Sequence, residues 1–225
     1  SRPTAPIESN TDTPTPMPVP TRRPSSTPSP ETTQPPTATP TEVFEPEAPL
    51  WGVAMESIDE AGGLEEALKL NVRWVRRWKH ISWRDVEPTQ GEYDWPVLAD
   101  LEQELQQARA NSLEPILEVQ ITPEWAQQVV PYACGPIRED KFEAFAEFME
   151  RLVTRYGPSS PYGVRYWQLG NEMDVAPGEV GPESVFGCWG DPEDPYYGGG
   201  HYAEMLKVVY PRVKAADPEA QVMMG

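Results

Sequence analysis

Asn171 and Glu172 stand directly after Val164–Gly170, a mostly apolar run of strand length. When a carboxylic acid lies at the rim of an apolar cleft, desolvation disfavours its charged form. It can then stay protonated near neutral pH and donate a proton to a leaving oxygen. The amide beside it can hold a hydroxyl group. The pair therefore predicts a general acid with a hydroxyl-binding neighbour, and the alternative is a solvated glutamate that merely follows a strand.

Arg76 and Glu118 are two further charged candidates on predicted strands. Arg76 ends the run Val72–Arg76, and Glu118 shares one face of Pro115–Ile121 with Gln120. A carboxylate on a buried strand needs a partner, and Arg76 on the neighbouring strand is a candidate. We expect a structural ion pair rather than catalysis by Glu118. The alternative for Arg76 is an ordinary surface or ion-paired arginine.

The elements that must position these residues follow from the pattern after Leu50. Apolar runs of strand length alternate there with amphipathic segments of helix length, which predicts βαβ units and a parallel sheet. The predicted strands are Leu50–Ala54, Val72–Arg76, Pro115–Ile121, Val164–Gly170 and Gln221–Gly225, and the predicted helices are Gly63–Leu70, Pro96–Asn111, Glu139–Tyr156 and His201–Ala216. Strand-to-helix segments are long and aromatic, so function is expected at the carboxyl ends of the strands.

The run Trp167-Gln168-Leu169-Gly170-Asn171-Glu172 resembles a known signature. It is similar to the Asn-Glu motif that ends the fourth strand in the large clan of retaining glycoside hydrolases built on (β/α)8 barrels, and its Leu-Gly-Asn-Glu form is particularly like glucuronidase and heparanase relatives. The resemblance implies that Glu172 is the catalytic acid/base and that Asn171 hydrogen-bonds the sugar 2-hydroxyl in an oxocarbenium-like transition state. Arg76 resembles the strand-two arginine of the clan, which steadies the nucleophilic carboxylate.

Two upstream passages resemble the same clan. Trp83–Pro88 followed by Gly91–Trp95 is similar to its passage after the second strand, and Thr122–Ala126 is similar to its Thr-Pro-x-Trp element after the third. The resemblance covers residues 50–225 and implies an α/β fold, the N-terminal portion of a TIM (β/α)8 barrel with about five βα units. It departs at Met173-Asp174, where clan members often have proline, so the substrate subfamily stays open.

The resemblance also implies a carbohydrate substrate and no cofactor. Trp78, His80 and Trp125 stand in segments after the strands, where flat side chains can contact the C–H faces of sugar rings, although each is equally suited to packing. His201 and Glu204 have a spacing that metals can use on a helix, but no second pair accompanies them, so no metal is expected.

The resemblance assigns no residue of this chain as the second catalytic carboxylate. Retaining hydrolysis needs two carboxyl groups about 5 to 5.5 Å apart, and the nucleophile of the clan ends the seventh strand. A whole barrel takes roughly 250 residues, more than remain after the N-terminal segment. We expect a truncated glycosidase whose nucleophile lies beyond residue 225. The alternative function is a noncatalytic cell-surface scaffold that binds carbohydrate.

Composition separates the chain into two parts and excludes some partners. Half of the 28 prolines fall in residues 1–49, interleaved with Thr and Ser, which predicts a disordered linker or stalk before a barrel domain over 50–225. Such stalks are typical of secreted or cell-surface proteins. The net charge of −18 argues against a nucleic-acid partner. No apolar run reaches the length of about 18 residues that predicts a membrane span.

Cys134 and Cys188 are the two cysteines of the chain, and their spacing matches no zinc or redox motif. Three interpretations stay open: free buried thiols, a disulfide, and reactive thiol chemistry. A disulfide across so long a loop would stabilise the fold by about 4 kcal/mol in the chain-entropy model.

Overall fold

The structure is a computed structural model that describes residues 51–58, 62–77 and 79–225. The linker or stalk predicted over residues 1–49 and the candidate Trp78 lie outside the described residues. In the part of the chain that the structure covers, no helix is long and apolar enough to cross a membrane.

A parallel sheet forms the centre of the fold. Its strands follow the order β1-β2-β4-β5-β6, and the short strand β3 also pairs with β4. The strands are β1 Gly52–Met55, β2 Trp74–Arg77, β3 Ile81–Ser82, β4 Glu114–Gln120, β5 Tyr166–Leu169 and β6 Gln221–Met224. Each pairing is parallel, so the carboxyl ends of the strands lie at one edge, as the sequence predicts.

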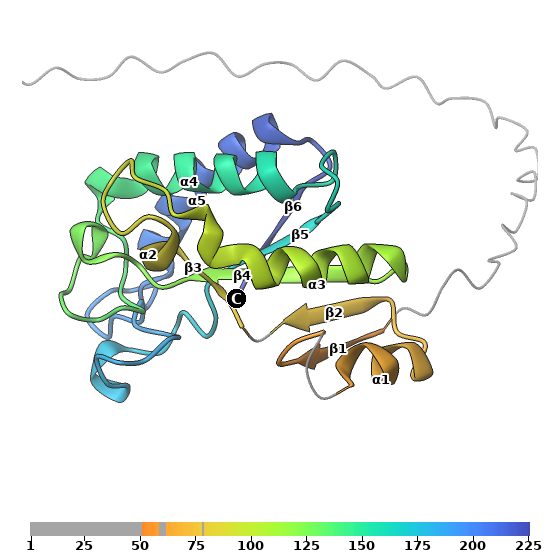
Figure 1. The fold of residues 1–225 in the computed structure, drawn as a ribbon. Coiled ribbons are helices and arrows are strands. Elements are labelled where there is room, and N and C mark those ends of the chain that lie inside the picture. The colour runs from red at the N-terminus through yellow and green to blue at the C-terminus, as the bar shows by residue number, and fades with distance from the viewer. Residues whose placement is uncertain (1–50, 59–61, 78) are drawn as a thin grey trace, which may run out of the picture. The chain divides into compact units, whose positions relative to one another are not determined.

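Helices connect successive strands and cover the sheet. Figure 1 shows α3, α4 and α5 along one side of the strands, and α1 beside β1 and β2. The α-helices are α1 Gly63–Lys69, α2 Trp83–Val86, α3 Ala99–Ala110, α4 Phe142–Tyr156 and α5 Gly199–Ala216, and the short 3-10 turns are η1 Trp95–Leu98, η2 Glu124–Ala126, η3 Glu139–Lys141 and η4 Pro177–Glu179. The five strands and four long helices that the sequence predicts are confirmed, with ends that differ by a few residues.

The core lies between α4 and the helix-facing side of the sheet. Phe148, Met149 and Leu152 recur at helical spacing on α4 and are fully buried, and they belong to one cluster with Leu117 and Val119 of β4. Burying each such side chain contributes about 1.5–3 kcal/mol. The alternate residues of β4 face the other side of the sheet, which leaves that side for polar groups.

The predicted strand Val72–Arg76 corresponds to β2, and the unpredicted strand β3 continues its line along β4. The step from Arg76 to Ile81 spans five residues, and it lies opposite the three-residue step from Ile116 to Val119 on β4. The sequence analysis missed this interruption, together with β3 and α2, because an added pair of residues leaves no trace in the apolar pattern. Ser82 begins α2, where its Oγ accepts a hydrogen bond from Asp85 N.

A buried ion pair joins β2 to α3. Arg77 and Glu104 are each at most 5% exposed and share three hydrogen bonds of 2.8–3.0 Å. Glu104 Oε2 also accepts a bond from Ile58 N, which fastens the segment after β1. The sequence does not predict this pair. Acidic residues and glutamines are equally frequent on α3, and nothing in the sequence marks Glu104 as the carboxylate that faces the sheet.

Candidate functional site

Arg76 is the centre of a hydrogen-bond network at the carboxyl ends of three neighbouring strands. Its Nε donates to Gln168 Oε1 at 2.9 Å. Its Nη2 donates to Glu118 Oε2 at 2.6 Å and to Asn171 Oδ1 at 2.8 Å. The network joins residues 92 and 95 positions apart in the sequence. The ion pair between Arg76 and Glu118 predicted from the sequence is confirmed, whereas the bonds to Gln168 and Asn171 were not anticipated.

Glu118 is the buried acid of this network. It is 3% exposed, and the side chain of Arg76 is 26% exposed. Burial raises the pKa of Glu118 to about 7, because a charged carboxylate loses its hydration there, and the nearby Arg76 guanidinium opposes part of that rise. Glu118 therefore changes its charge close to neutral pH.

Asn171 is held with a defined orientation. Its Oδ1 accepts from Arg76, so its Nδ2 hydrogens are directed to other acceptors. Gln168 supports the same geometry from β5, since its Nε2 donates to Gly170 O at 2.8 Å while its oxygen accepts from Arg76. The amide that the clan resemblance assigns to a sugar hydroxyl is thus presented as a hydrogen-bond donor.

Glu172 follows Asn171 on the turn after β5 and is exposed. Its backbone has a φ of 50°, in the left-handed region. The described residues leave the Glu172 side chain exposed, so they do not themselves enclose its carboxyl group. The apolar-walled cleft that the sequence predicts around this group stays a prediction.

Gly170 permits the sharp exit from β5. It has a φ of 76°, and a Cβ atom at this position would lie 2.1 Å from Met173 Sδ. Gly170 N still donates to Val119 O at 2.9 Å, so the strand pairing continues up to the turn. The glycine of the Leu-Gly-Asn-Glu motif is therefore required by the backbone, and its presence places Asn171 over the Arg76 network.

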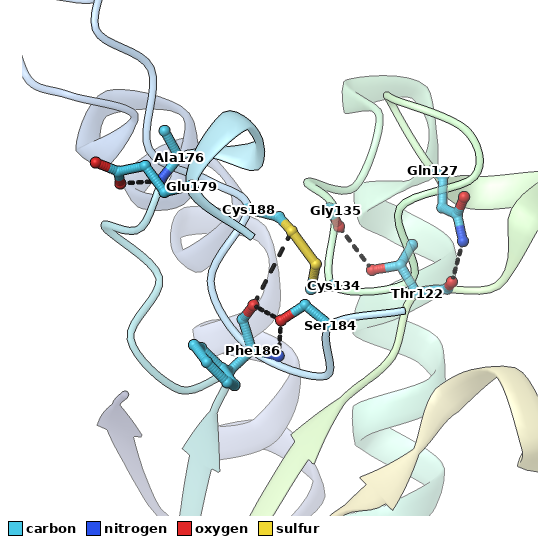
Figure 2. The surroundings of a disulfide bond; sticks show 9 residues. All are labelled: Thr122, Gln127, Cys134, Gly135, Ala176, Glu179, Ser184, Phe186 and Cys188. Carbon is cyan, nitrogen blue, oxygen red and sulfur yellow. Dashed lines mark hydrogen bonds between the residues drawn. A yellow bond between two sulfur atoms is a disulfide. The ribbon is translucent and has the colours of Figure 1, made fainter. Parts of the chain in front are cut away.

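A disulfide between Cys134 and Cys188 ties the segment after β4 to the segment after β5. Figure 2 shows the bond and its surroundings, in which Thr122 Oγ1 donates to Gly135 O at 3.0 Å. On the other side, Gly187 N donates to Asn171 O at 3.0 Å. Of the three interpretations that the sequence left open, the structure has the disulfide. The bond anchors Cys188 within the loop that begins with Asn171 and Glu172.

The passage from Trp83 to Trp95 has a structural role. Glu87 is 1% exposed, and it accepts bonds from Trp83 Nε1 at 2.6 Å and from Gly91 N at 2.7 Å. Trp125 Nε1 donates to Glu87 O at 3.2 Å, and its ring meets Trp83 edge-on at 5.1 Å. The two upstream passages that resemble the clan thus brace each other, and Glu87 is committed to this contact.

The aromatic candidates have different positions. Trp78 lies outside the described residues. His80 is half-buried in the segment between β2 and β3, and burial lowers the pKa of its imidazole below the ordinary value. Trp125 is half-buried and is engaged in packing through Trp83 and Glu87. Within the described ranges, no hydrogen bond or ring contact links His80 or Trp125 to the Arg76 network.

No set of three or more His, Cys, Asp or Glu side chains in the described part of the chain is arranged to hold a metal ion. His201, which the sequence analysis considered as a ligand, places Nε2 at 2.7 Å from Ile137 O, and its ring is tilted by 46° against that of Trp189. Packing against these neighbours accounts for the position of His201.

Comparison with known proteins finds no matching family model and no matching curated sequence. Solved structures do match. A family 39 glycoside hydrolase from Bacteroides cellulosilyticus has a TM-score of 0.55 and 21% identity, covering 77% of this chain and 31% of that one. An exo-β-1,4-mannosidase from an Opitutaceae bacterium has a TM-score of 0.51, 19% identity and the same coverages. An endo-glycoceramidase II from Rhodococcus has a TM-score of 0.51 and 17% identity, covering 72% and 43–44%.

These likenesses establish the fold, which is a portion of the (β/α)8 barrel found in glycoside hydrolases. The chain spans less than half the length of each of these three proteins. Because β3 continues the line of β2 along β4, β5 is the fourth strand of the barrel, which is the strand on which the sequence analysis placed Asn171 and Glu172.

Proposed function

We propose that the protein takes part in hydrolysis of O-glycosidic bonds in a polysaccharide or oligosaccharide, with Glu172 as the acid/base and Asn171 as the residue that holds a sugar hydroxyl. The observation that carries the proposal is the turn after β5. There Arg76 orients the Asn171 amide beside an accessible carboxyl group, at the edge of the sheet where barrel enzymes build their sites.

The proposed mechanism is retaining, with two carboxyl groups on opposite sides of the bond that breaks. Glu172 protonates the leaving oxygen, and a nucleophilic carboxylate attacks the anomeric carbon to form a glycosyl-enzyme that water then hydrolyses. Glu118 does not fit the nucleophile, because it is buried and its Oε2 is bound to Arg76 at 2.6 Å. We place the nucleophile on a later barrel strand, outside the described residues, as the clan resemblance implies.

The disulfide bond of the chain is consistent with a polysaccharide substrate outside the cytoplasm. The disulfide between Cys134 and Cys188 supports an oxidising compartment, in which such bonds persist. We therefore propose that the protein is secreted or held at the cell surface.

A second candidate function is a noncatalytic scaffold that binds carbohydrate. The exposure of Glu172 favours it, because a general acid usually needs a site that keeps its carboxyl group partly desolvated. The oriented Asn171 amide serves a binding scaffold as well as it serves an enzyme.

Release of reducing sugar from a panel of polysaccharides and aryl glycosides, measured on a longer protein that includes the later barrel strands, separates the two functions. We expect Glu172→Gln to lower turnover by about 10²–10⁴-fold on substrates with poor leaving groups, and azide to restore turnover of activated aryl glycosides. Glu183→Gln is the matched control, because Glu183 is an exposed acid on the same loop.

Retention of full turnover by Glu172→Gln would remove Glu172 from the acid/base role. Binding of a glycan by residues 50–225, with no release of sugar even by the longer protein, would favour the scaffold. Failure to bind or cleave any glycan would reject both functions.

A further inference from the structure

Arg76 Nη2 is shared by two acceptors that have different roles. One acceptor is the buried Glu118 carboxylate at 2.6 Å, and the other is Asn171 Oδ1 at 2.8 Å. We infer that Glu118 is a positioning residue, which orients Asn171 for its ligand by fixing the guanidinium of Arg76. The inference rests on the proposed function for the ligand of Asn171, whereas the coupling from Glu118 to Asn171 can be tested without any ligand.

The strand register explains why Glu118 can act in this way. Glu118 and Gln168 are direct partners on β4 and β5, and Arg76 on β2 pairs with Ile116, one layer below Glu118. The arginine side chain must therefore extend toward the carboxyl ends of the strands to reach both partners. Gln168 holds Nε, and Glu118 holds Nη2, so the plane of the guanidinium is defined by two neighbouring strands.

The bond to Glu118 dominates this geometry. It is a charge-assisted bond between a buried carboxylate and a guanidinium, and such bonds are roughly twice as strong as neutral ones. Without the negative charge, Nε would still be held by Gln168, but rotation of the terminal nitrogens would no longer be opposed by an anion. The hydrogen bond from Arg76 Nη2 to Asn171 Oδ1 would then weaken as well.

The consequence for Asn171 is chemical. When Oδ1 is bound to Arg76, the amide offers only Nδ2 hydrogens, so it selects a ligand atom with a lone pair such as a hydroxyl oxygen. When the bond to Arg76 is lost, the amide can turn and offer either group. Glu118 thus decides whether Asn171 is a dedicated donor, although Glu118 itself lies beneath the ligand-facing groups.

The charged surroundings of Glu118 are simple enough for its titration to serve as the readout. Arg76 on β2 is its charged partner, and the facing residue on β5 is the neutral Gln168. On its own strand, Glu114 pairs with Arg73 at the opposite end of β4. Glu172 and Asp174 are the acids close to Asn171 in sequence, so both Glu172→Gln and Asp174→Asn must be compared with Glu118→Gln.

Nuclear magnetic resonance of the isotope-labelled 225-residue chain provides the test. The measured quantities are the side-chain carboxyl carbon of Glu118 and the Nδ2 amide signals of Asn171 across the neutral pH range. We expect both to shift with one common midpoint in the wild-type protein. That shared midpoint should persist in Glu172→Gln, in Asp174→Asn and in the control Glu114→Gln. The Asn171 shift should vanish in Glu118→Gln.

Three results would overturn the inference. They are an Asn171 amide that does not respond at the Glu118 midpoint, a response that disappears in Glu172→Gln or Asp174→Asn, and a response that survives in Glu118→Gln. If Glu118→Gln does not fold, the inference is still tested by the titration midpoints of Glu118 and of the Asn171 amide, compared between the wild-type protein and Glu172→Gln. Since no sugar is present, a negative result here leaves the proposed function standing, and failure of glycan binding leaves the coupling standing.

Discussion

Asn171 and Glu172 are neighbours in sequence but are held in very different ways. The Asn171 side chain is bonded to Arg76, and its carbonyl accepts from Gly187 N. Glu172 is exposed and has a left-handed backbone. At the scale of single residues, the site therefore consists of a fixed amide beside an accessible acid, and the link between them is the turn that Gly170 permits.

Gly170→Ala tests that turn. We expect a loss of about 1–3 kcal/mol in the free energy of unfolding, because alanine would have to adopt the positive φ of Gly170, and the flexible Met173 side chain would also have to move. Denaturant unfolding measures the change. Gly178→Ala is the matched control on the same loop, since a Cβ there meets nothing within 4 Å. Equal stability of the two variants would show that the turn does not depend on Gly170.

At the scale of elements, the strands carry the network and the loops after them carry the ligand-facing groups. Tyr202 of α5 donates from its hydroxyl to Leu169 O at 2.7 Å, which secures the last residue of β5 from the helix side. The disulfide secures the loop after β5 at Cys188. The part of the loop that carries Glu172 thus lies between two fastened points.

Removing the disulfide by Cys134→Ser together with Cys188→Ser should lower the free energy of unfolding by about 4 kcal/mol, since the closed loop spans 54 positions. Chemical denaturation with and without reductant measures this loss, and amide hydrogen exchange should rise over residues 171–188. The double variant is its own control, because reductant should not destabilise it further. A wild-type protein whose unfolding midpoint is unchanged by reductant would contradict the expectation.

At the scale of the whole molecule, charge limits the ligand. The chain has 36 acidic and 18 basic residues, and the segment 170–200 contains acidic residues but neither Lys nor Arg. Arg76, the cation of the network, is committed to Glu118, Gln168 and Asn171. The excess of acidic residues gives the chain a net negative charge, which disfavours polymers that carry carboxylate or sulfate groups.

A matched pair of polymers tests this limit. We expect stronger binding to a neutral cellulose or xylan derivative than to its carboxymethylated form at about 0.01 M salt, and a smaller difference at about 1 M salt, where the Debye length falls to about 3 Å. Affinity electrophoresis measures both. Charge reversal by Glu183→Lys with Glu193→Lys should narrow the low-salt difference. Preferential binding of the carboxymethylated polymer by the wild-type protein would refute the prediction.

The order of strands and helices was predictable because it depends on local periodicity. The stripe on α4 and the alternation on β4 mark the covered side of the sheet, and the Asn-Glu motif marks the strand end. Arg76 and Glu118 were also predictable as a pair, since they lie on the same face of neighbouring strands.

Only the tertiary structure decided the rest. The bonds from Arg76 to Gln168 and Asn171 depend on the register of three strands, and the choice of a disulfide for Cys134 and Cys188 depends on the distance between two loops. These features arise from contacts between residues 54 to 95 positions apart, and no local pattern in the sequence reports how far apart such residues lie in space.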